Sequence, residues 1–180
     1  RAMGFCLFNN VAVAAAWALA EAGVGRVAIV DIDVHHGNGT EDAFADVPEV
    51  LYVSLHQYPF YPGTGHWRDR GRGAGEGSCV NIPFPAGTGD AGYALAFRRV
   101  VIRAVRRFQP ELILVSTGYD AHWADPLAWM LVSLSGYHSI AEDLVSLAQE
   151  LCSGRIVFVL EGGYDLRILA HGVATTICAM

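Results

Sequence analysis

Three polar side chains alternate along one short segment of the sequence, "VDIDVHHGNG" at positions 30–39. Asp31, Asp33 and His35 are two residues apart, so on an extended strand they project to the same side. The residues before them, "RVAIV", are apolar and indicate a buried strand. Because an unpaired buried charge is costly, this strand end needs a compensating partner, and a divalent cation would provide one.

A further carboxylate, Asp120, follows another apolar run in "ELILVSTGYDAH" at positions 111–122. Two carboxylates and an imidazole can hold zinc and leave one position for water. Zinc bound in this way lowers the pKa of that water towards ~7 and polarises a carbonyl. A D-x-D pair that caps local turns, with histidines as hydrogen-bonded core residues, is the alternative. The longer pattern D-x-D-x-H-H-G-N-G favours the metal site.

Tyr164 follows two glycines at the end of the apolar run "RIVFVLEGG" at positions 155–163. Glycine at a strand end permits close backbone approach or unusual dihedral angles. A phenol beside a metal could donate a hydrogen bond to a developing oxyanion. Taken alone, the residue fits a core tyrosine better.

Alternating strand and helix patterns must position these residues. Five short apolar runs predict strands, at positions 26–33, 50–56, 79–84, 111–118 and 155–163. Helical patterns occupy positions 10–22, 90–108 and 135–152, and a fourth begins near Tyr164. The order predicts a three-layer α/β fold whose mostly parallel sheet carries helices on both faces. Sites in such sheets form at the carboxyl ends of strands, and the long glycine-rich stretch 57–78 is expected to be a functional loop.

The composition limits which kinds of protein this chain can be. The 180 residues fit a single domain, of which 53% are hydrophobic and only 17% charged, with a net charge of −6. No basic run tracks a nucleic-acid backbone, so direct nucleic-acid binding is not expected. The apolar segment at 10–22 is too short to span a membrane. Four scattered cysteines are typical of a reduced, cytoplasmic protein. The chain starts at Arg1 and stops within an apolar pattern, so we expect an internal piece of a longer protein, with a fold that is incomplete at both ends.

Several linked motifs carry a family resemblance. "GFCLFNNVAVAA", "DIDVHHGNGTEDAF", "SLHQYPFYPGTG", "STGYDAHWADPLA" and "LEGGYD" occur in that order across the whole chain. The chain resembles the zinc-dependent histone deacetylase superfamily, in the style of bacterial class II-like, acetoin-utilisation and acetylpolyamine amidohydrolase-like members. The resemblance implies the arginase/deacetylase fold and a hydrolase that removes acetyl groups from ε-acetyl-lysine by metal-activated water attack.

The resemblance also assigns roles to single residues. Asp33, His35 and Asp120 match the zinc ligands, and Tyr164 matches the tyrosine that polarises the acetyl carbonyl. Phe5 and Tyr61 match aromatics that flank the acyl-lysine channel, Gly4 matches a glycine whose carbonyl accepts the substrate amide, and Leu127 matches a gate residue. A structural potassium site is implied at Asp31, Asp33, His35, Ser54 and Leu55.

Two features depart from the family pattern or bear on the substrate. The family places a tandem histidine pair, the general base and acid, shortly before "GFC", and this chain contains no such pair there. Asp31 and Asn38 match the residues that orient those histidines. Leu127 offers no charge to a cationic substrate, which favours acyl-lysine over acetylpolyamine.

The alternatives that stay open are an acetylpolyamine or small acylamine deacetylase, and a catalytically inactive metal-binding fragment. A dimanganese arginase-like hydrolase would need more carboxylate ligands. The sequence does not predict the oligomeric state.

Overall fold

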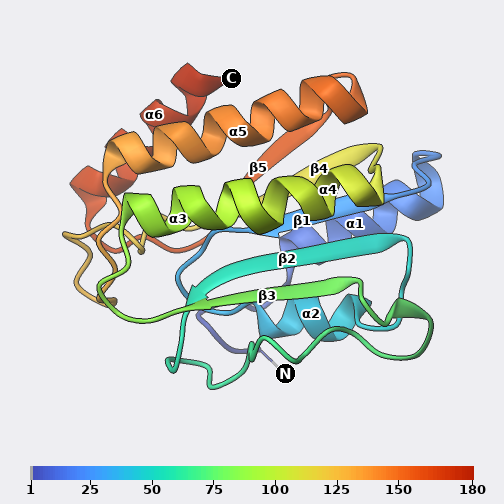
Figure 1. The fold of residues 1–180 in the computed structure, drawn as a ribbon, viewed down its shortest axis with the longest axis horizontal. Coiled ribbons are helices and arrows are strands. Elements are labelled where there is room, and N and C mark those ends of the chain that lie inside the picture. The colour runs from blue at the N-terminus through green and yellow to red at the C-terminus, as the bar shows by residue number, and fades with distance from the viewer. Residues whose placement is uncertain (1) are drawn as a thin grey trace.

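A computed structural model describes residues 2–180, and its centre is a sheet of five parallel strands in the order β3-β2-β1-β4-β5 (Figure 1). The strands are β1 (Val27–Asp31), β2 (Val50–Gln57), β3 (Cys79–Phe84), β4 (Leu112–Thr117) and β5 (Ile156–Leu160). Every residue of β1 and β2 is buried, as expected for strands covered on both faces. The predicted α/β class with a parallel sheet is confirmed.

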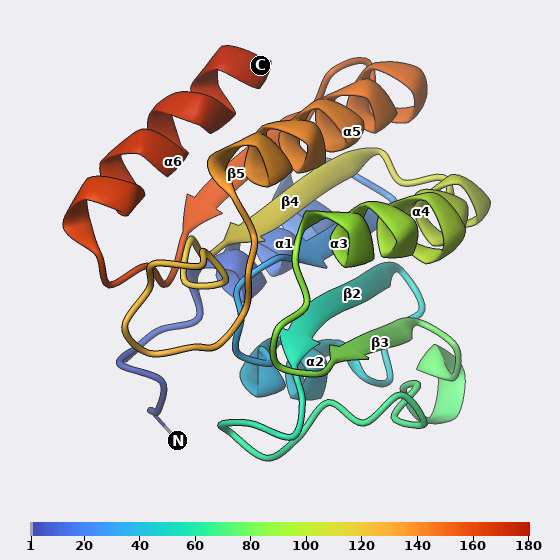
Figure 2. The same ribbon diagram turned by 60° about the vertical axis from the view of Figure 1, so that its left-hand side comes forward.

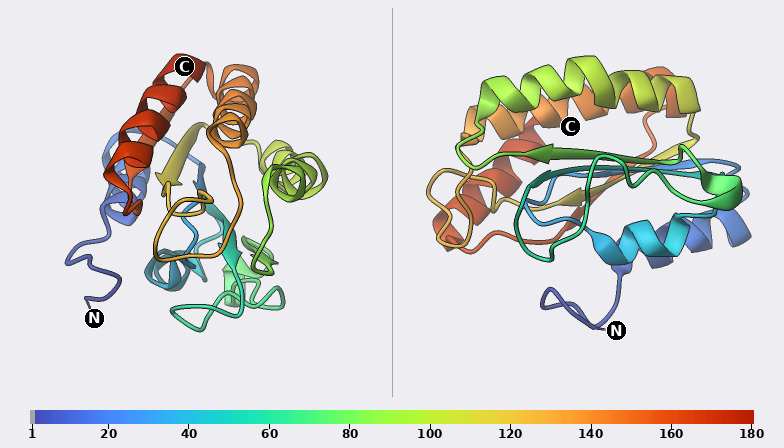
Figure 3. Two further views of the ribbon diagram at one scale, coloured as in Figure 1. Left: turned by 90° about the vertical axis from the view of Figure 1, so that its left-hand side faces the viewer. Right: turned by 60° about the horizontal axis from the view of Figure 1, so that its bottom comes forward.

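Helices cover both faces of the sheet. They are α1 (Asn10–Glu21), α2 (Asn38–Phe44), α3 (Asp90–Ala96), α4 (Ile102–Phe108), α5 (Leu134–Cys152) and α6 (Leu166–Ala179). One face carries α3, α4 and α5, and the other carries α1 and α2, while α6 lies alongside α5 (Figure 3). Two apolar clusters result. The one beneath α3–α5 includes Val30, Val53 and Val115, and the one beneath α1 includes Ile29 and Leu114.

Local chemistry sets the helix ends. The side chain of Ser133 caps α5 by accepting the N–H of Gly136 at 3.1 Å, and Ser153 ends the helix in the left-handed conformation. Asp165 caps α6 by accepting the backbone N–H groups of Arg167 at 2.9 Å and Ile168 at 3.2 Å. The helix predicted to begin near Tyr164 therefore begins two residues later, directly after the cap.

Two elements differ from the sequence prediction. The helix predicted at 90–108 is divided by a π-helical turn, η2 (Phe97–Val101), which separates α3 from α4. The seven-residue helix α2 was not predicted, because it is short and opens with Asn38 and Gly39, which are poor helix formers. Thr40 and Phe44 form its buried side.

The predicted long loop runs from β2 to β3 across the edge of the sheet and contains only a short 3-10 turn, η1 (Gly73–Gly75) (Figure 2). His56 donates through Nε2 to the carbonyl oxygen of Gly65 at 2.8 Å and so fastens the loop. Gly65 has a positive φ of 87°, and a Cβ there would overlap the rings of His56 and His36. This close approach requires glycine.

Candidate metal centre

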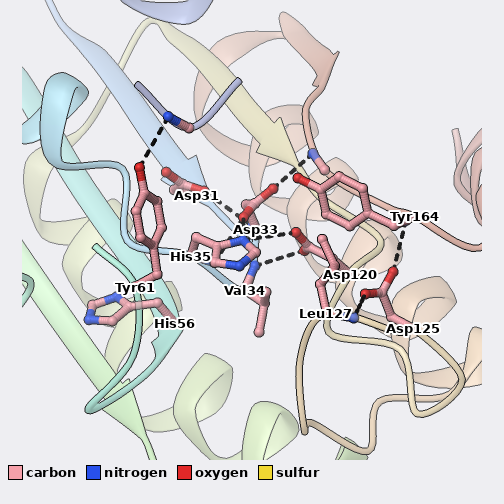
Figure 4. A network of polar contacts seen from close by, with 12 residues as sticks. Asp31, Asp33, Val34, His35, His56, Tyr61, Asp120, Asp125, Leu127 and Tyr164 are labelled. Atoms are coloured by element: carbon pink, nitrogen blue, oxygen red, sulfur yellow. Dashed lines mark hydrogen bonds and ion pairs between the residues drawn. The ribbon is translucent and has the colours of Figure 1, made fainter. Parts of the chain in front are cut away.

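The three predicted ligands come from adjacent strands. Asp33 and His35 follow the last residue of β1, and Asp120 follows β4, which pairs with β1 in parallel. One ligand atom from each of the three lies within 4.8 Å of the other two. Figure 4 shows the three side chains pointing toward one another at the carboxyl edge of the sheet. The geometry therefore brings together the set that the sequence predicted from two separate motifs.

Backbone N–H groups hold both carboxylates in place. Val34 donates to Oδ1 of Asp120 at 2.9 Å, and Gly162 donates to Oδ2 of Asp33 at 2.8 Å. His35 donates its own N–H to Oδ1 of Asp33 at 2.8 Å. Main-chain donors of this kind fix the direction of a carboxylate before any ligand binds, which is how outer contacts orient metal ligands.

Negative charge is crowded at this strand end. Burial, followed by the charge of Asp33, raises the pKa of Asp120 to about 7. The same two causes raise the pKa of Glu161 to about 7. Burial alone lowers the pKa of His35, but its Nδ1 contacts with Asp120 at 3.1 Å and Asp33 at 3.2 Å outweigh burial and raise that pKa to about 10. The carboxylates therefore favour a positive charge at the point where the three side chains meet.

Two glycines leave the space that the ligands occupy. A Cβ at Gly118 or Gly162 would overlap carboxylate oxygens of both Asp33 and Asp120. Neither glycine has a positive φ, so close approach rather than backbone conformation is what requires glycine here. Two carboxylates and one imidazole form a donor set that fits zinc. Main-chain donors hold these ligands, and Gly118 and Gly162 leave space for them.

Tyr164 lies beside this centre on the segment between β5 and α6. Its ring meets that of Phe5 edge to face, with 6.1 Å between the centroids. Burial, followed by the charges of Asp120, Asp33 and Asp125, raises the pKa of the phenol to about 12, so it stays protonated and can donate a hydrogen bond. The side chain is 36% exposed, which excludes the alternative of a fully buried core tyrosine.

The residues predicted to flank a substrate channel lie next to the metal centre and Tyr164. Gly4 donates its N–H to the hydroxyl of Tyr61 at 3.2 Å, which joins the N-terminal segment to the long loop. Tyr61 meets the ring of His35 edge to face with 6.0 Å between centroids. Leu127 lies near Tyr164, and Phe5 and Leu127 are both exposed (Figure 4).

The residues predicted for potassium binding and for orienting histidines are placed as follows. Asp31 and Ser54 are register partners on β1 and β2, and Leu55 follows Ser54 in the buried strand. Asp31 accepts from Asp33 N–H at 3.1 Å and from the hydroxyl of Tyr52 at 2.9 Å. Asn38 opens α2 and donates to the sulfur of Met3 at 3.5 Å.

Two contributors to the site, Tyr52 and Asp125, were missed by sequence reasoning, whereas His36 was expected to lie behind the ligands rather than to bind the metal. Tyr52 reads as one more apolar strand residue, yet its hydroxyl binds the buried carboxylate of Asp31. His36 contacts Glu41 at 3.3 Å and Thr64 at 2.8 Å, beneath the long loop. Asp125 contacts the backbone of Tyr164. Tyr52, Ser54 and His56 alternate with apolar residues along β2, which offered a signal for Tyr52. The other contacts join segments that no local pattern connects.

Comparisons with known proteins bear on the family and the fold of the chain. The family model described as "Histone deacetylase domain" matches residues 1–180. "Histone deacetylase 14, chloroplastic" from Arabidopsis thaliana is 48% identical over 178 residues, and "Histone deacetylase 10, chloroplastic" from Oryza sativa subsp. japonica is 49% identical over 174 residues. The crystal structure of the HDA15 HD domain superposes with a TM-score of 0.93 at 45% sequence identity.

The coverage of these matches is unequal. They include 99%, 97% and 98% of this chain, but only 42%, 39% and 49% of the respective relatives. The chain thus spans less than half of the length of each relative. No helix within residues 2–180 is long and apolar enough to cross a membrane.

Proposed function

Because the chain belongs to the histone deacetylase domain family, we propose that it is part of a zinc-dependent amidohydrolase that removes acetyl groups from ε-acetyl-lysine. The observation that carries this proposal is the convergence of Asp33, His35 and Asp120 within 4.8 Å at the carboxyl edge of the sheet. These three residues would hold zinc, which supplies an activated water and a Lewis acid for the amide carbonyl.

The chain's own residues then act on the substrate. The phenol of Tyr164 donates a hydrogen bond to the carbonyl oxygen as negative charge develops there, an effect worth roughly 3 to 4 kcal/mol for one such donor. Phe5 and Tyr61 flank the alkyl chain of the acyl-lysine, and the carbonyl of Gly4 accepts the substrate amide N–H. Leu127 lies at the entrance of the acyl-lysine channel, as its gate residue.

Proton transfer requires a general base. We propose that a tandem histidine pair, located before "GFC" in a longer chain, takes this role, and that Asp31 and Asn38 orient it. The chain as given would then be inactive by itself. Potassium is proposed at the strand ends of β1 and β2, where a monovalent cation would offset part of the carboxylate charge. The residues of this site would be Asp31, Asp33, His35, Ser54 and Leu55.

The leucine at position 127 supports acyl-lysine as the substrate, since it presents no carboxylate to a free cationic amine. An acetylpolyamine substrate is the alternative, and it would need acidic contacts from segments outside this chain. All four cysteines are free thiols, which supports a reducing compartment such as the cytoplasm. The plant relatives named chloroplastic give no support to a specifically bacterial source.

The test uses a chain extended upstream through the expected histidine pair. We expect kcat/KM on an acetyl-lysine peptide to exceed that on N-acetylputrescine and to require zinc. Asp120→Asn should abolish zinc retention and activity, because it removes a ligand charge from a fully buried position. Asp46→Asn, at an exposed carboxylate outside the site, is the matched control. Full activity of Asp120→Asn would refute the proposal, and a preference for N-acetylputrescine would move the substrate to polyamines.

A further inference from the structure

One buried carboxylate connects the tyrosine beside the metal centre to the residue at the gate. Asp125 lies in the loop between β4 and α5 and is 7% exposed. Its Oδ2 accepts the backbone N–H of Tyr164 at 2.8 Å, and its Oδ1 accepts the backbone N–H of Leu127 at 2.9 Å. Figure 4 shows both contacts. The backbone N–H of Asp125 itself donates to the carbonyl of His122 at 2.9 Å.

Tyr164 needs such a contact because its own segment is irregular. β5 ends at Leu160 and α6 begins at Leu166, and Gly163 between them has a positive φ of 130°. Gly162 is fixed on one side of Tyr164 by its bond to Asp33, and Asp165 caps α6 on the other side. Between Gly162 and Asp165, the backbone N–H of Tyr164 donates to the carboxylate of Asp125.

We propose that Asp125 is a positioning residue that sets the Tyr164 backbone and the gate at Leu127 with one carboxylate. This inference rests on the proposed function. Hydrogen bonds to an ionised acceptor are short and strong, and two of them from one rigid group hold two chain segments in a single relative geometry. Positioning of this kind matters because a displacement of about 1 Å at a catalytic group can cost roughly 10²-fold in rate.

The two oxygens allow graded substitutions. Asp125→Asn keeps one carbonyl oxygen and replaces the other acceptor by an NH₂ donor, so the amide can satisfy only one of the two N–H groups. Asp125→Ala satisfies neither. Asp165→Ala is the matched control, since it removes the neighbouring carboxylate that caps α6 and leaves both contacts of Asp125 in place.

Hydrogen exchange followed by mass spectrometry tests the contact without any turnover. In the zinc-loaded, upstream-extended protein, Asp125→Ala should speed exchange at the amides of both Leu127 and Tyr164. Asp165→Ala should speed exchange at the first turn of α6 and leave those two amides protected. Unchanged exchange at Leu127 and Tyr164 in Asp125→Ala would overturn the proposal.

A double-substitution cycle with Tyr164→Phe then tests the role in catalysis. In the presence of the phenol we expect Asp125→Ala to lower kcat by roughly 10²-fold, with a smaller loss for Asp125→Asn. Once the phenol is removed, Asp125→Ala should lower kcat little further, because the residue acts through Tyr164. Full additivity of the two losses would overturn the positioning role. If the wild-type protein hydrolyses no acyl-amide, the proposed function fails, while the exchange experiment still decides whether the contact exists.

Discussion

Replacing Gly162 by alanine tests whether the carboxylates of Asp33 and Asp120 form a metal site. A Cβ at this position would lie 2.6 Å from Oδ2 of Asp33 and would overlap Oδ2 of Asp120. Real Cβ atoms essentially never approach another heavy atom closer than 3.0 Å, so Asp33 must move by at least about 0.4 Å and Asp120 by more. Zinc–oxygen distances vary by only about 0.2 Å, so both ligands would leave their binding positions.

We expect Gly162→Ala to weaken zinc binding by roughly 10- to 100-fold, the range found when contacts that orient metal ligands are altered. This corresponds to about 1.4 to 2.8 kcal/mol of binding free energy. The measurement is competition for zinc against a chromophoric chelator. The backbone contributes little to the effect, because Gly162 does not occupy the left-handed region that disfavours alanine.

Gly39→Ala is the control for the general effect of adding a methyl group. Gly39 lies in α2, where the nearest atom to an added Cβ is the amide nitrogen of Asn9 at 3.6 Å, an ordinary contact. Zinc affinity should be unchanged in this variant, and the unfolding free energy should rise slightly because alanine favours helix. Wild-type zinc affinity in a folded Gly162→Ala protein would refute the reasoning, since the ligands could not then be where the structure has them.

The remaining predictions concern two buried side chains beneath the site. Tyr52→Phe removes the hydroxyl that donates to the buried carboxylate of Asp31, so the unfolding free energy should fall by about 1 to 3 kcal/mol in denaturant titrations. Tyr93→Phe is its control, because the buried Tyr93 hydroxyl has no hydrogen-bond partner within residues 2–180 and its loss should cost little; equal losses would contradict the assignment. His56 has its pKa lowered from 6.5 to about 4 by burial and then by the charge of His36, so the unfolded chain binds the proton more readily than the folded one. The contribution of His56 to stability is therefore complete above pH 6.5 and is lost as the pH falls towards 4, by roughly 3 kcal/mol in total. The difference in unfolding free energy between wild type and His56→Gln should shrink over that pH range. A difference that stays constant with pH would contradict the lowered pKa.

The sequence predicted the sheet well because its strands are buried on both faces. Apolar runs such as "RVAIV" and "ELILV" leave few alternatives to a parallel strand, and the helical periods between them fix the layers. The location of the site was also predictable, since Asp33 and Asp120 are charged residues placed shortly after apolar runs. The strands themselves end earlier than predicted, β1 at Asp31 rather than at position 33 and β5 at Leu160 rather than at position 163. The rule that sites form at the carboxyl ends of parallel strands then joined two motifs that lie 87 positions apart.

Other features of the site could not be predicted for a physical reason. A carboxylate that accepts a backbone N–H has no partner side chain to reveal it, so the contact of Asp125 with Tyr164 leaves no trace in the sequence. The helix α2 is stabilised by packing of Thr40 and Phe44 rather than by its own propensity. The π-helical turn at Phe97–Val101 likewise lies inside an uninterrupted helical pattern.

The costly polarity at the end of β1 can be explained only by the strands beside it. Asp31, Asp33, Asp120 and Glu161 approach one another because the parallel register brings the carboxyl ends of three adjacent strands to one edge. Burial, followed by the charge of Asp33, raises the pKa values of Asp31, Asp120 and Glu161, so the folded chain carries a site whose stability depends on positive charge. A fold selected for stability alone would place apolar residues here. Here main-chain donors hold the carboxylates, and two glycines leave the space for them. This arrangement is consistent with a cation site at this edge of the sheet.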